Sequence, residues 1–153
     1  MEQTEVDIRL VTALPETARR ELAGLYCLAG FTDEGDNPAL WLDAVVAGSL
    51  LAAGVFRSGQ LIGFGRALGD GVSDAYLQDI VIDPAFRGQG LGSRLVRFLV
   101  AELRKTGTGW IGIIAVPGKE EFYRRLGFTP LADHTPMRFD EDARVSGEGE
   151  AHF

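Results

Sequence analysis

Arg87-Gly88-Gln89-Gly90-Leu91-Gly92 is the stretch that decides the fold of this chain. An apolar run over residues 77–82 precedes it, and a segment with helical periodicity, Ser93–Lys105, follows it. A strand, a glycine-rich turn and a helix N-terminus in this order direct successive backbone N–H groups into the turn, where the helix dipole adds partial positive charge. Glycine also lets a bulky group approach the backbone closely. The stretch therefore predicts a pyrophosphate site, to which Arg87 adds a charge-assisted contact.

Three phosphate-binding patterns compete for this turn. A P-loop needs Lys and Ser/Thr after its last glycine, but Ser93-Arg94 follows here. A dinucleotide fingerprint, G-x-G-x-x-G, meets serine or leucine where its last glycine belongs, whether it starts at Gly88 or at Gly90. The third pattern, Arg/Gln-x-x-Gly-x-Gly/Ala, is met by Arg87, Gly90 and Gly92. It is the acetyl-CoA signature of the GNAT N-acetyltransferase superfamily, which the chain resembles here. A turn that needs glycine only for tight packing is the alternative.

A second segment, Phe122-Tyr123-Arg124-Arg125-Leu126-Gly127-Phe128, resembles the F-Y-x-x-x-G-F motif of the same family. It ends a short predicted helix over residues 118–126, with Gly127 as its C-cap, and a predicted strand over 110–116 separates it from the phosphate turn. The resemblance implies an α/β fold: a single GNAT-like domain with a mixed central sheet flanked by helices on both faces. It also implies an acetyl-CoA-dependent N-acetyltransferase that acts on a primary amine, of a small molecule or a protein, by direct attack in a ternary complex.

Two other classes of protein stay open at this stage. A non-catalytic acyl-CoA-binding or sensing module would keep the glycine turn but transfer nothing to an amine. A nucleotide-binding domain could use the same cradle for ATP or NAD, although the missing Lys-Ser/Thr pair argues against it.

Hydrophobic periodicity and turn residues predict the remaining elements. They are a strand over 6–11, a helix over 15–29, a helix over 37–48, strands over 50–56 and 60–66 joined by a hairpin turn at Ser58-Gly59, a strand over 76–82, and a last strand pair within Thr129–Phe139 that Pro130 and Pro136 interrupt. We expect a domain over residues 1–139 and a flexible C-terminal tail over 140–153, which is polar and rich in small residues.

The resemblance implies a cofactor site on the strand before the glycine turn and on the turn itself. The pantetheine arm would pair with the backbone of Ile80, Val81 and Ile82, and an N–H near Val81 would hold the thioester carbonyl and then the oxyanion. The pyrophosphate would be held by Arg87, Gly88, Gln89, Gly90, Leu91, Gly92 and Ser93. Many family members place an Asn six positions before the motif tyrosine, where this chain has Pro117. That contact is therefore lost, or is replaced by Lys119 reaching a phosphate.

Acetyl transfer to an amine is helped by an acid for the departing sulfur and a base for the ammonium proton. Tyr123 occupies the acid position of many family members, although it could simply pack the helix. Asp79 and Gln78 are neighbours on a strand and face opposite ways. If Gln78 shares a face with Ile80 toward the substrate, Asp79 reaches the site only through a β-bulge. Asp79 is thus either the base or a structural carboxylate that ties the sheet to a helix end. Gln78 and Tyr76 are candidate substrate-binding residues.

Composition bounds the remaining possibilities. The 153 residues are 46% hydrophobic and carry a formal net charge of −7, which supports a sizeable core and disfavours nucleic acid as a partner. No apolar run is long enough to span a membrane, and the polar start of the chain is not a secretory signal. Cys27, the single cysteine, is expected to pack inside a helix and suits a reducing cytoplasm. We expect no metal site, and a second copy of the chain, as a homodimer, is a candidate partner.

Overall fold

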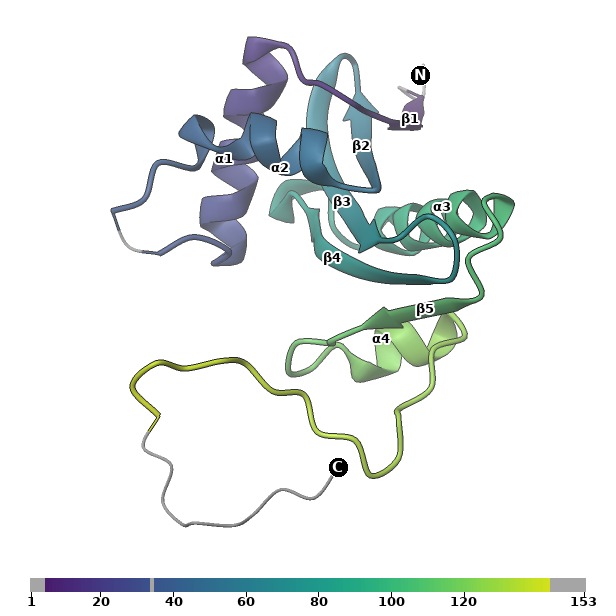
Figure 1. The fold of residues 1–153 in the computed structure, drawn as a ribbon. Helices are drawn as coiled ribbons and strands as arrows, with labels where there is room; N and C mark the ends of the chain where they lie inside the picture. Colours follow the sequence, from purple (N-terminus) through teal and green to yellow (C-terminus); the bar gives the residue numbers. More distant parts are fainter. Residues whose placement is uncertain (1–4, 34, 144–153) are drawn as a thin grey trace.

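The fold is described by a computed structural model over residues 5–33 and 35–143 (Figure 1). In chain order its elements are β1 (Val6–Leu10), α1 (Glu16–Ala29), η1 (Pro38–Leu40), α2 (Leu42–Gly48), β2 (Leu51–Arg57), β3 (Gln60–Gly69), β4 (Asp74–Ile82), η2 (Pro84–Phe86), α3 (Leu91–Lys105), β5 (Trp110–Ile113) and α4 (Glu120–Arg125). Most of the predicted flexible tail, 144–153, lies outside the described residues, and residues 140–143 form a turn.

The strands form one mixed sheet in the order β1-β2-β3-β4-β5. The first four are antiparallel neighbours, whereas β5 runs parallel to β4. A parallel pair needs a crossover, and α3 supplies it. The predicted hairpin turn is present, since Ser58 and Gly59 join β2 to β3 with φ values of 50° and 79°. Positive φ at both turn residues matches the twist of the flanking strands.

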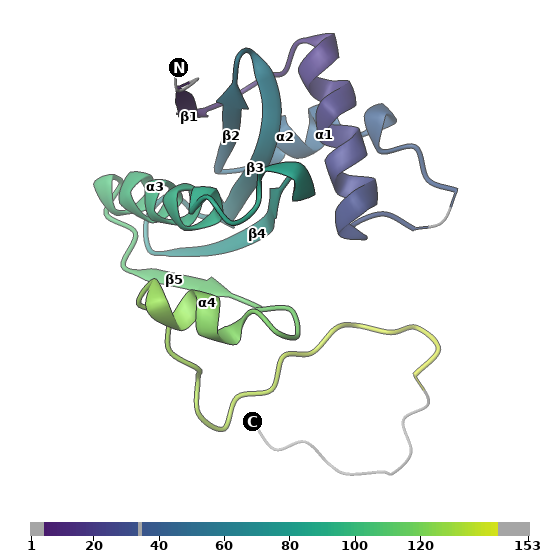
Figure 2. The ribbon, with the colours of Figure 1, turned by 180° about the vertical axis from the view of Figure 1, so that it is seen from behind.

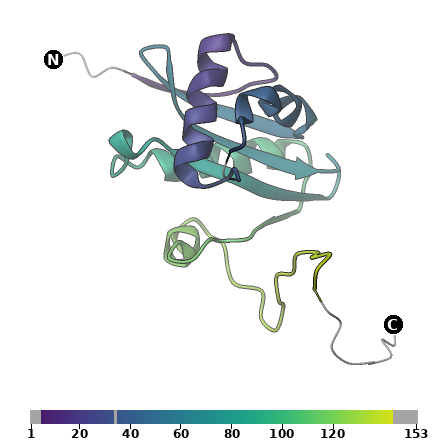
Figure 3. The same cartoon turned by 90° about the vertical axis from the view of Figure 1, so that its left-hand side faces the viewer.

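Helices cover both faces of the sheet, as the sequence predicted (Figures 2 and 3). On one face, α3 buries its apolar stripe against the sheet, and Leu95, Leu99 and Leu103 are fully buried. Tyr123 of α4 belongs to the same apolar cluster. On the opposite face, α1 and α2 bury residues such as Leu22 and Leu42 in a second cluster. The sheet is therefore the middle of three layers, which is a stable arrangement for an α/β domain.

The predicted strand pair within Thr129–Phe139 is wrong for the described chain. After α4 the backbone follows an extended course away from the sheet, without strand pairing up to residue 143, and residues 129–143 are exposed (Figure 1). Pro130 and Pro136 explain part of this outcome, because proline removes a ladder donor and restricts the residue before it. As a result, β5 has a partner strand only on its β4 side among the described residues.

Three smaller predictions also need correction. The helix predicted over 37–48 is a 3₁₀ turn, η1, followed by α2, because Trp41 has φ −125° and ψ −6° and interrupts the helical path. Strand β5 ends at Ile113 rather than at residue 116. Cys27 lies on the exposed side of α1 rather than in the core. Within the described ranges, none of the helices has the length and apolar character needed to cross a membrane.

Candidate functional site

The turn between β4 and α3 forms an open cradle for an anion. Gly88 and Gly90 both have a φ of 75°, and Gly90 is the N-cap of α3 without any side-chain cap. A Cβ atom at either glycine would have no heavy atom within 4 Å, so the backbone here is accessible to a bulky group. Asp83 fixes the entry to the turn by accepting the N–H of Ala85 at 2.9 Å. Arg87 donates through Nε to the carbonyl of Ile82 at 3.3 Å.

The backbone donors of this cradle are free to bind a ligand. The first helical hydrogen bond of α3 runs from the N–H of Arg94 to the carbonyl of Gly90, at 3.0 Å. Among the described residues, the N–H groups of residues 88–93 have no acceptor. Helix N-termini leave such donors unsatisfied, and the helix dipole makes them attractive to an anion. Residues 87–93, predicted to hold a pyrophosphate, are thus brought together in a geometry that fits one.

A second cation lies at the edge of the cradle. Arg57, at the end of β2, donates to the side chain of Gln89 at 3.4 Å and sits 5.6 Å from the centre of the Phe86 ring. Sequence reasoning missed Arg57, because its position depends on how β2 lies relative to the turn.

The strand before the cradle loses its outer partner halfway along its length. Pairing between β4 and β5 ends at Leu77 and Ile113, so the rest of β4 faces a gap on that side. Asp83 donates its N–H to Ile62 of β3 at 2.8 Å. Because successive N–H groups on a strand point to opposite sides, the N–H of Ile82 points toward the gap and that of Val81 toward β3. Within the part of the chain that the structure describes, the gap therefore offers backbone groups without a partner, with Ile82 rather than Val81 as the donor at this end.

A β-bulge interrupts β4 beside this gap. Arg66 pairs with Gln78 and Phe64 with Val81, so Asp79 and Ile80 together oppose the single residue between them on β3. Asp79 has a φ of 56°, in the left-handed region. The bulge breaks the expected alternation along the strand, because the side chains of Gln78 and Asp79 both contact the guanidinium of Arg66, at 3.3 and 2.6 Å. Gln78 thus does not share a face with Ile80, which packs in the α3 cluster.

Asp79 is held by two partners from other elements. Its Oδ2 accepts from the hydroxyl of Tyr26 on α1 at 2.8 Å and from Nε of Arg66 on β3 at 2.6 Å. The side chains of Arg66 and Asp79 are only 15% and 20% exposed. Burial, followed by the charge of Asp79, raises the pKa of Tyr26 well above its ordinary value, so Tyr26 stays protonated and donates.

Sequence reasoning missed both partners of Asp79. Tyr26 lies within the helix predicted over 15–29 and Arg66 at the end of the strand predicted over 60–66, and neither was given a role. A buried polar atom needs a hydrogen-bond partner. The carboxylate of Asp79 in an otherwise apolar strand is therefore the signal that could have led to Tyr26 and Arg66.

Tyr123 lies in a closely packed aromatic environment on α4. It is 8% exposed, and its ring centre lies 4.9 Å from that of Phe122 and 5.8 Å from that of Phe128. Desolvation raises its pKa. Gly127, with a φ of 96°, ends the helix as predicted, since its N–H donates to the carbonyl of Arg124. A Cβ at Gly92 would lie 3.4 Å from the Phe122 ring, so α4 packs against the first turn of α3.

The remaining predicted residues lie on exposed surfaces. Tyr76, which is 47% exposed, pairs with Trp110 of β5 at a ring-centre distance of 4.9 Å. Trp110 was not predicted as a site residue, and its indole ring lies over Gly112. Lys119 is exposed at the start of α4. Among the described residues, no cluster of three or more His, Cys, Asp or Glu side chains could hold a metal ion.

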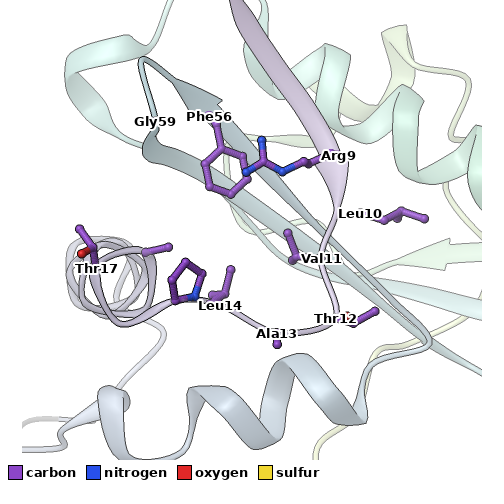
Figure 4. A pocket seen from close by; sticks show the side chains of 11 residues that line it. Arg9, Leu10, Val11, Thr12, Ala13, Leu14, Thr17, Phe56 and Gly59 are labelled. Carbon is purple, nitrogen blue, oxygen red and sulfur yellow. The ribbon is translucent and has the colours of Figure 1, made fainter.

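A pocket of about 410 Å³ lies elsewhere on the molecule, beside the β1–α1 loop (Figure 4). The guanidinium of Arg9 lies 3.8 Å above the Phe56 ring at its wall. The residues that line this pocket include none of those predicted from the sequence. The cradle and the strand gap are therefore a separate site.

Comparisons with known proteins identify what this arrangement resembles. A family model described as an acetyltransferase (GNAT) domain matches residues 49–130, more than half of the chain. Serotonin N-acetyltransferase 2, chloroplastic, from Oryza sativa subsp. japonica is 44% identical over 71 residues, which are 46% of this chain and 36% of that protein. The chain thus matches well under two thirds of the length of this relative.

Solved structures share the fold over most of the chain. A GNAT-family acetyltransferase from Streptococcus pneumoniae TIGR4 superposes with a TM-score of 0.74 at 22% identity, covering 91% of this chain and all of that one. AAC(6')-Iy, in complex with the bisubstrate analogue CoA-S-monomethyl-acetylneamine, superposes with a TM-score of 0.69 at 19% identity, covering 89% of this chain and 99% of the other.

Proposed function

This chain belongs to the GNAT acetyltransferase family, and from that membership we propose that it moves an acetyl group from acetyl-CoA to a primary amine of a small molecule or a protein. The observation that carries the proposal is the row of N–H groups at residues 88–93, which have no acceptor within the described ranges. They follow a strand whose outer side, in the same part of the chain, has no partner beyond Leu77. A diphosphate and a peptide-like arm, joined in one ligand, match these two features in that order.

The chain's own residues would bind acetyl-CoA at three places. The cradle would hold the diphosphate through its backbone amides, and Arg87 would add charge. The backbone of β4 that faces the gap would pair with the pantetheine arm and hold the thioester carbonyl through an N–H group. When bound, acetyl-CoA supplies an activated acetyl thioester. The complex of AAC(6')-Iy with a CoA-containing analogue supports this choice of ligand through the shared fold.

Tyr123 is proposed to donate the proton that the departing sulfur of coenzyme A takes up. Its raised pKa keeps the hydroxyl protonated at neutral pH, as a general acid requires. Among the described residues the hydroxyl has no hydrogen-bond partner, so its proton is not committed to another group. The packing of Phe122 against the start of α3 fixes α4, and with it Tyr123, relative to the cradle.

The acceptor amine is proposed to approach over the exposed side chains of Tyr76, Gln78 and Trp110. These lie on β4 and β5, on the side of the sheet where Arg66 contacts Gln78. Aromatic faces attract cationic groups, and the net charge of −7 favours a cationic substrate. Names of similar proteins point to different amines, serotonin in one and an acetylneamine analogue in another, so the class proposed here is the primary amine.

A second copy of the chain is the proposed protein partner. Leu131, Met137 and Phe139 are 56%, 89% and 86% exposed on the extended segment after α4, which is unusual for large apolar side chains close together in sequence. Light scattering on the purified protein should give twice the mass of one chain. A monomeric mass would rule the homodimer out.

The proposed reaction is tested by thiol release from acetyl-CoA with a panel of amines: polyamines, arylalkylamines, aminoglycosides, amino acids, and peptides with free N-termini or lysines. Release that depends on one class of amine supports the proposal and identifies the acceptor. Tight binding of acetyl-CoA without release for any amine would instead support the acyl-CoA-binding module.

A further inference from the structure

We propose that Asp79 is a positioning residue, which Tyr26 and Arg66 hold so that the bulge of β4 keeps its shape beside the acetyl-CoA gap. This inference rests on the function proposed above, since it assigns a role to a residue of the same site. Of the two interpretations of Asp79, it favours a tie between layers over the base for the ammonium proton.

The backbone supplies the first argument. Asp79 has a φ of 56°, a conformation that costs most residues energy and that Asn, Asp and Gly tolerate best. In the bulge, Asp79 directly precedes Ile80. The conformation of Asp79 therefore sets the direction in which the N–H and C=O groups of the following residues point. Those groups belong to the part of β4 that, over residues 5–33 and 35–143, has no partner strand on its outer side. A change at Asp79 would therefore turn the donors that face the gap.

The contacts of the carboxylate supply the second argument. One oxygen, Oδ2, accepts from both Tyr26 and Arg66. Two protein donors on one oxygen hold the carboxylate in a single orientation, which suits a tie between layers. The three residues come from α1, β3 and β4, so the network joins the helix layer to two neighbouring strands at the bulge.

The surroundings of Tyr26 supply the third argument. Tyr26 is 2% exposed, and its ring lies between the rings of Phe31, Trp41 and Phe64, at centre distances of 5.4, 5.8 and 6.1 Å. A hydroxyl on such a closely packed ring has little freedom to move. The hydroxyl therefore holds the Asp79 carboxylate in a fixed position, and the carboxylate in turn holds the bulge.

Three substitutions at Asp79 separate positioning from base catalysis. Asp79→Asn keeps an oxygen acceptor and tolerates the left-handed backbone, and Asp79→Gly loses the side chain but keeps the backbone freedom. Asp79→Ala loses both. Asp133 offers a matched control, because its φ is 61° but it is exposed in the segment after α4. Asp133→Ala therefore carries the same backbone strain away from the site.

The measurements are acetyl-CoA affinity by calorimetry, kcat with the best amine, and melting temperature. Positioning predicts that Asp79→Asn loses at most about tenfold in kcat. Asp79→Gly, which loses the network but keeps the backbone freedom, should weaken acetyl-CoA binding by a few-fold, and Asp79→Ala, which loses both, should weaken it roughly tenfold or more. Asp133→Ala should lower the melting temperature and leave acetyl-CoA affinity unchanged. A loss of about a hundredfold or more in kcat for Asp79→Asn, Asp79→Gly and Asp79→Ala alike, with acetyl-CoA affinity intact, would make Asp79 the base and overturn the proposal. Wild-type behaviour of Asp79→Ala would overturn it as well.

Tyr26→Phe keeps the proposal testable if Asp79→Ala fails to fold. It removes one hydroxyl from the network without touching the backbone of β4, and it should weaken acetyl-CoA binding by a few-fold, whereas unchanged affinity would count against the network. Failure of the function itself looks different, because the wild-type protein would then transfer no acetyl group to any amine, whether or not it binds acetyl-CoA. In that case the melting temperatures test whether Asp79 holds the bulge, and Asp79→Ala is expected to melt below both Asp79→Asn and Asp79→Gly.

Discussion

Gly90→Val is the substitution that tests the cradle most severely. Gly90 has a φ of 75° at the N-cap of α3, and the space around its missing Cβ is open. A β-branched residue there pays about 1–2 kcal/mol of backbone strain, which lowers the melting temperature by roughly 2–8 °C. The branched side chain would also occupy the space through which a diphosphate reaches the amides. Losing two hydrogen bonds to a charged group, at about 1.5–3 kcal/mol each, would raise the Kd for acetyl-CoA about a hundredfold or more.

Gly107→Val is the matched control for this experiment. Gly107 also has a positive φ, 91°, and open space at its Cβ position, but it follows the C-terminus of α3. Both variants should lose comparable stability by thermal denaturation, while only Gly90→Val should lose acetyl-CoA affinity by calorimetry. Acetyl-CoA binding that is as tight in Gly90→Val as in the wild type would refute the cradle.

Three further predictions follow from the same structure. Tyr123→Phe keeps the aromatic packing but removes the proton donor, so stopped-flow thiol release should show kcat lowered by about a hundredfold at similar acetyl-CoA affinity; an unchanged kcat would remove the assignment. The raised pKa of Tyr26 predicts stability that is intact below about pH 10 and then falls by about 1.4 kcal/mol per pH unit as the unfolded state deprotonates first. Alkaline unfolding curves should therefore be less steep for Tyr26→Phe, and identical curves would contradict the burial. Leu99→Ala should cost about 2–5 kcal/mol in urea unfolding, because the side chain is fully buried, and a loss below 1 kcal/mol would not fit.

The cradle was predictable from the sequence because its determinants are local. The glycines at 88, 90 and 92 and the apolar stripe of α3 lie within one short segment, so neighbouring residues alone indicate a strand, a turn and a helix N-terminus. The same holds for Gly127 and the end of α4. Such features need no knowledge of which segments meet in space.

The environment of Asp79 could not be predicted, because it depends on distant residues. Tyr26 is 53 positions away and Arg66 is 13 positions away in the chain. Strict alternation along a strand cannot reveal a bulge, so Gln78 and Asp79 were expected on opposite faces. The strand pair expected after α4 failed for a related reason, since pairing depends on the surroundings as well as on β propensity. The exposure of Cys27 likewise depends on how α1 is rotated against the sheet.

Backbone amide chemical shifts during titration with acetyl-CoA test the central claim most directly. If the amides at the start of α3 hold the diphosphate, the largest changes fall on residues 88–93, with further changes on Ile80 and Ile82 of β4. Changes confined to the pocket beside the β1–α1 loop, or the absence of any change at saturating acetyl-CoA, would contradict it.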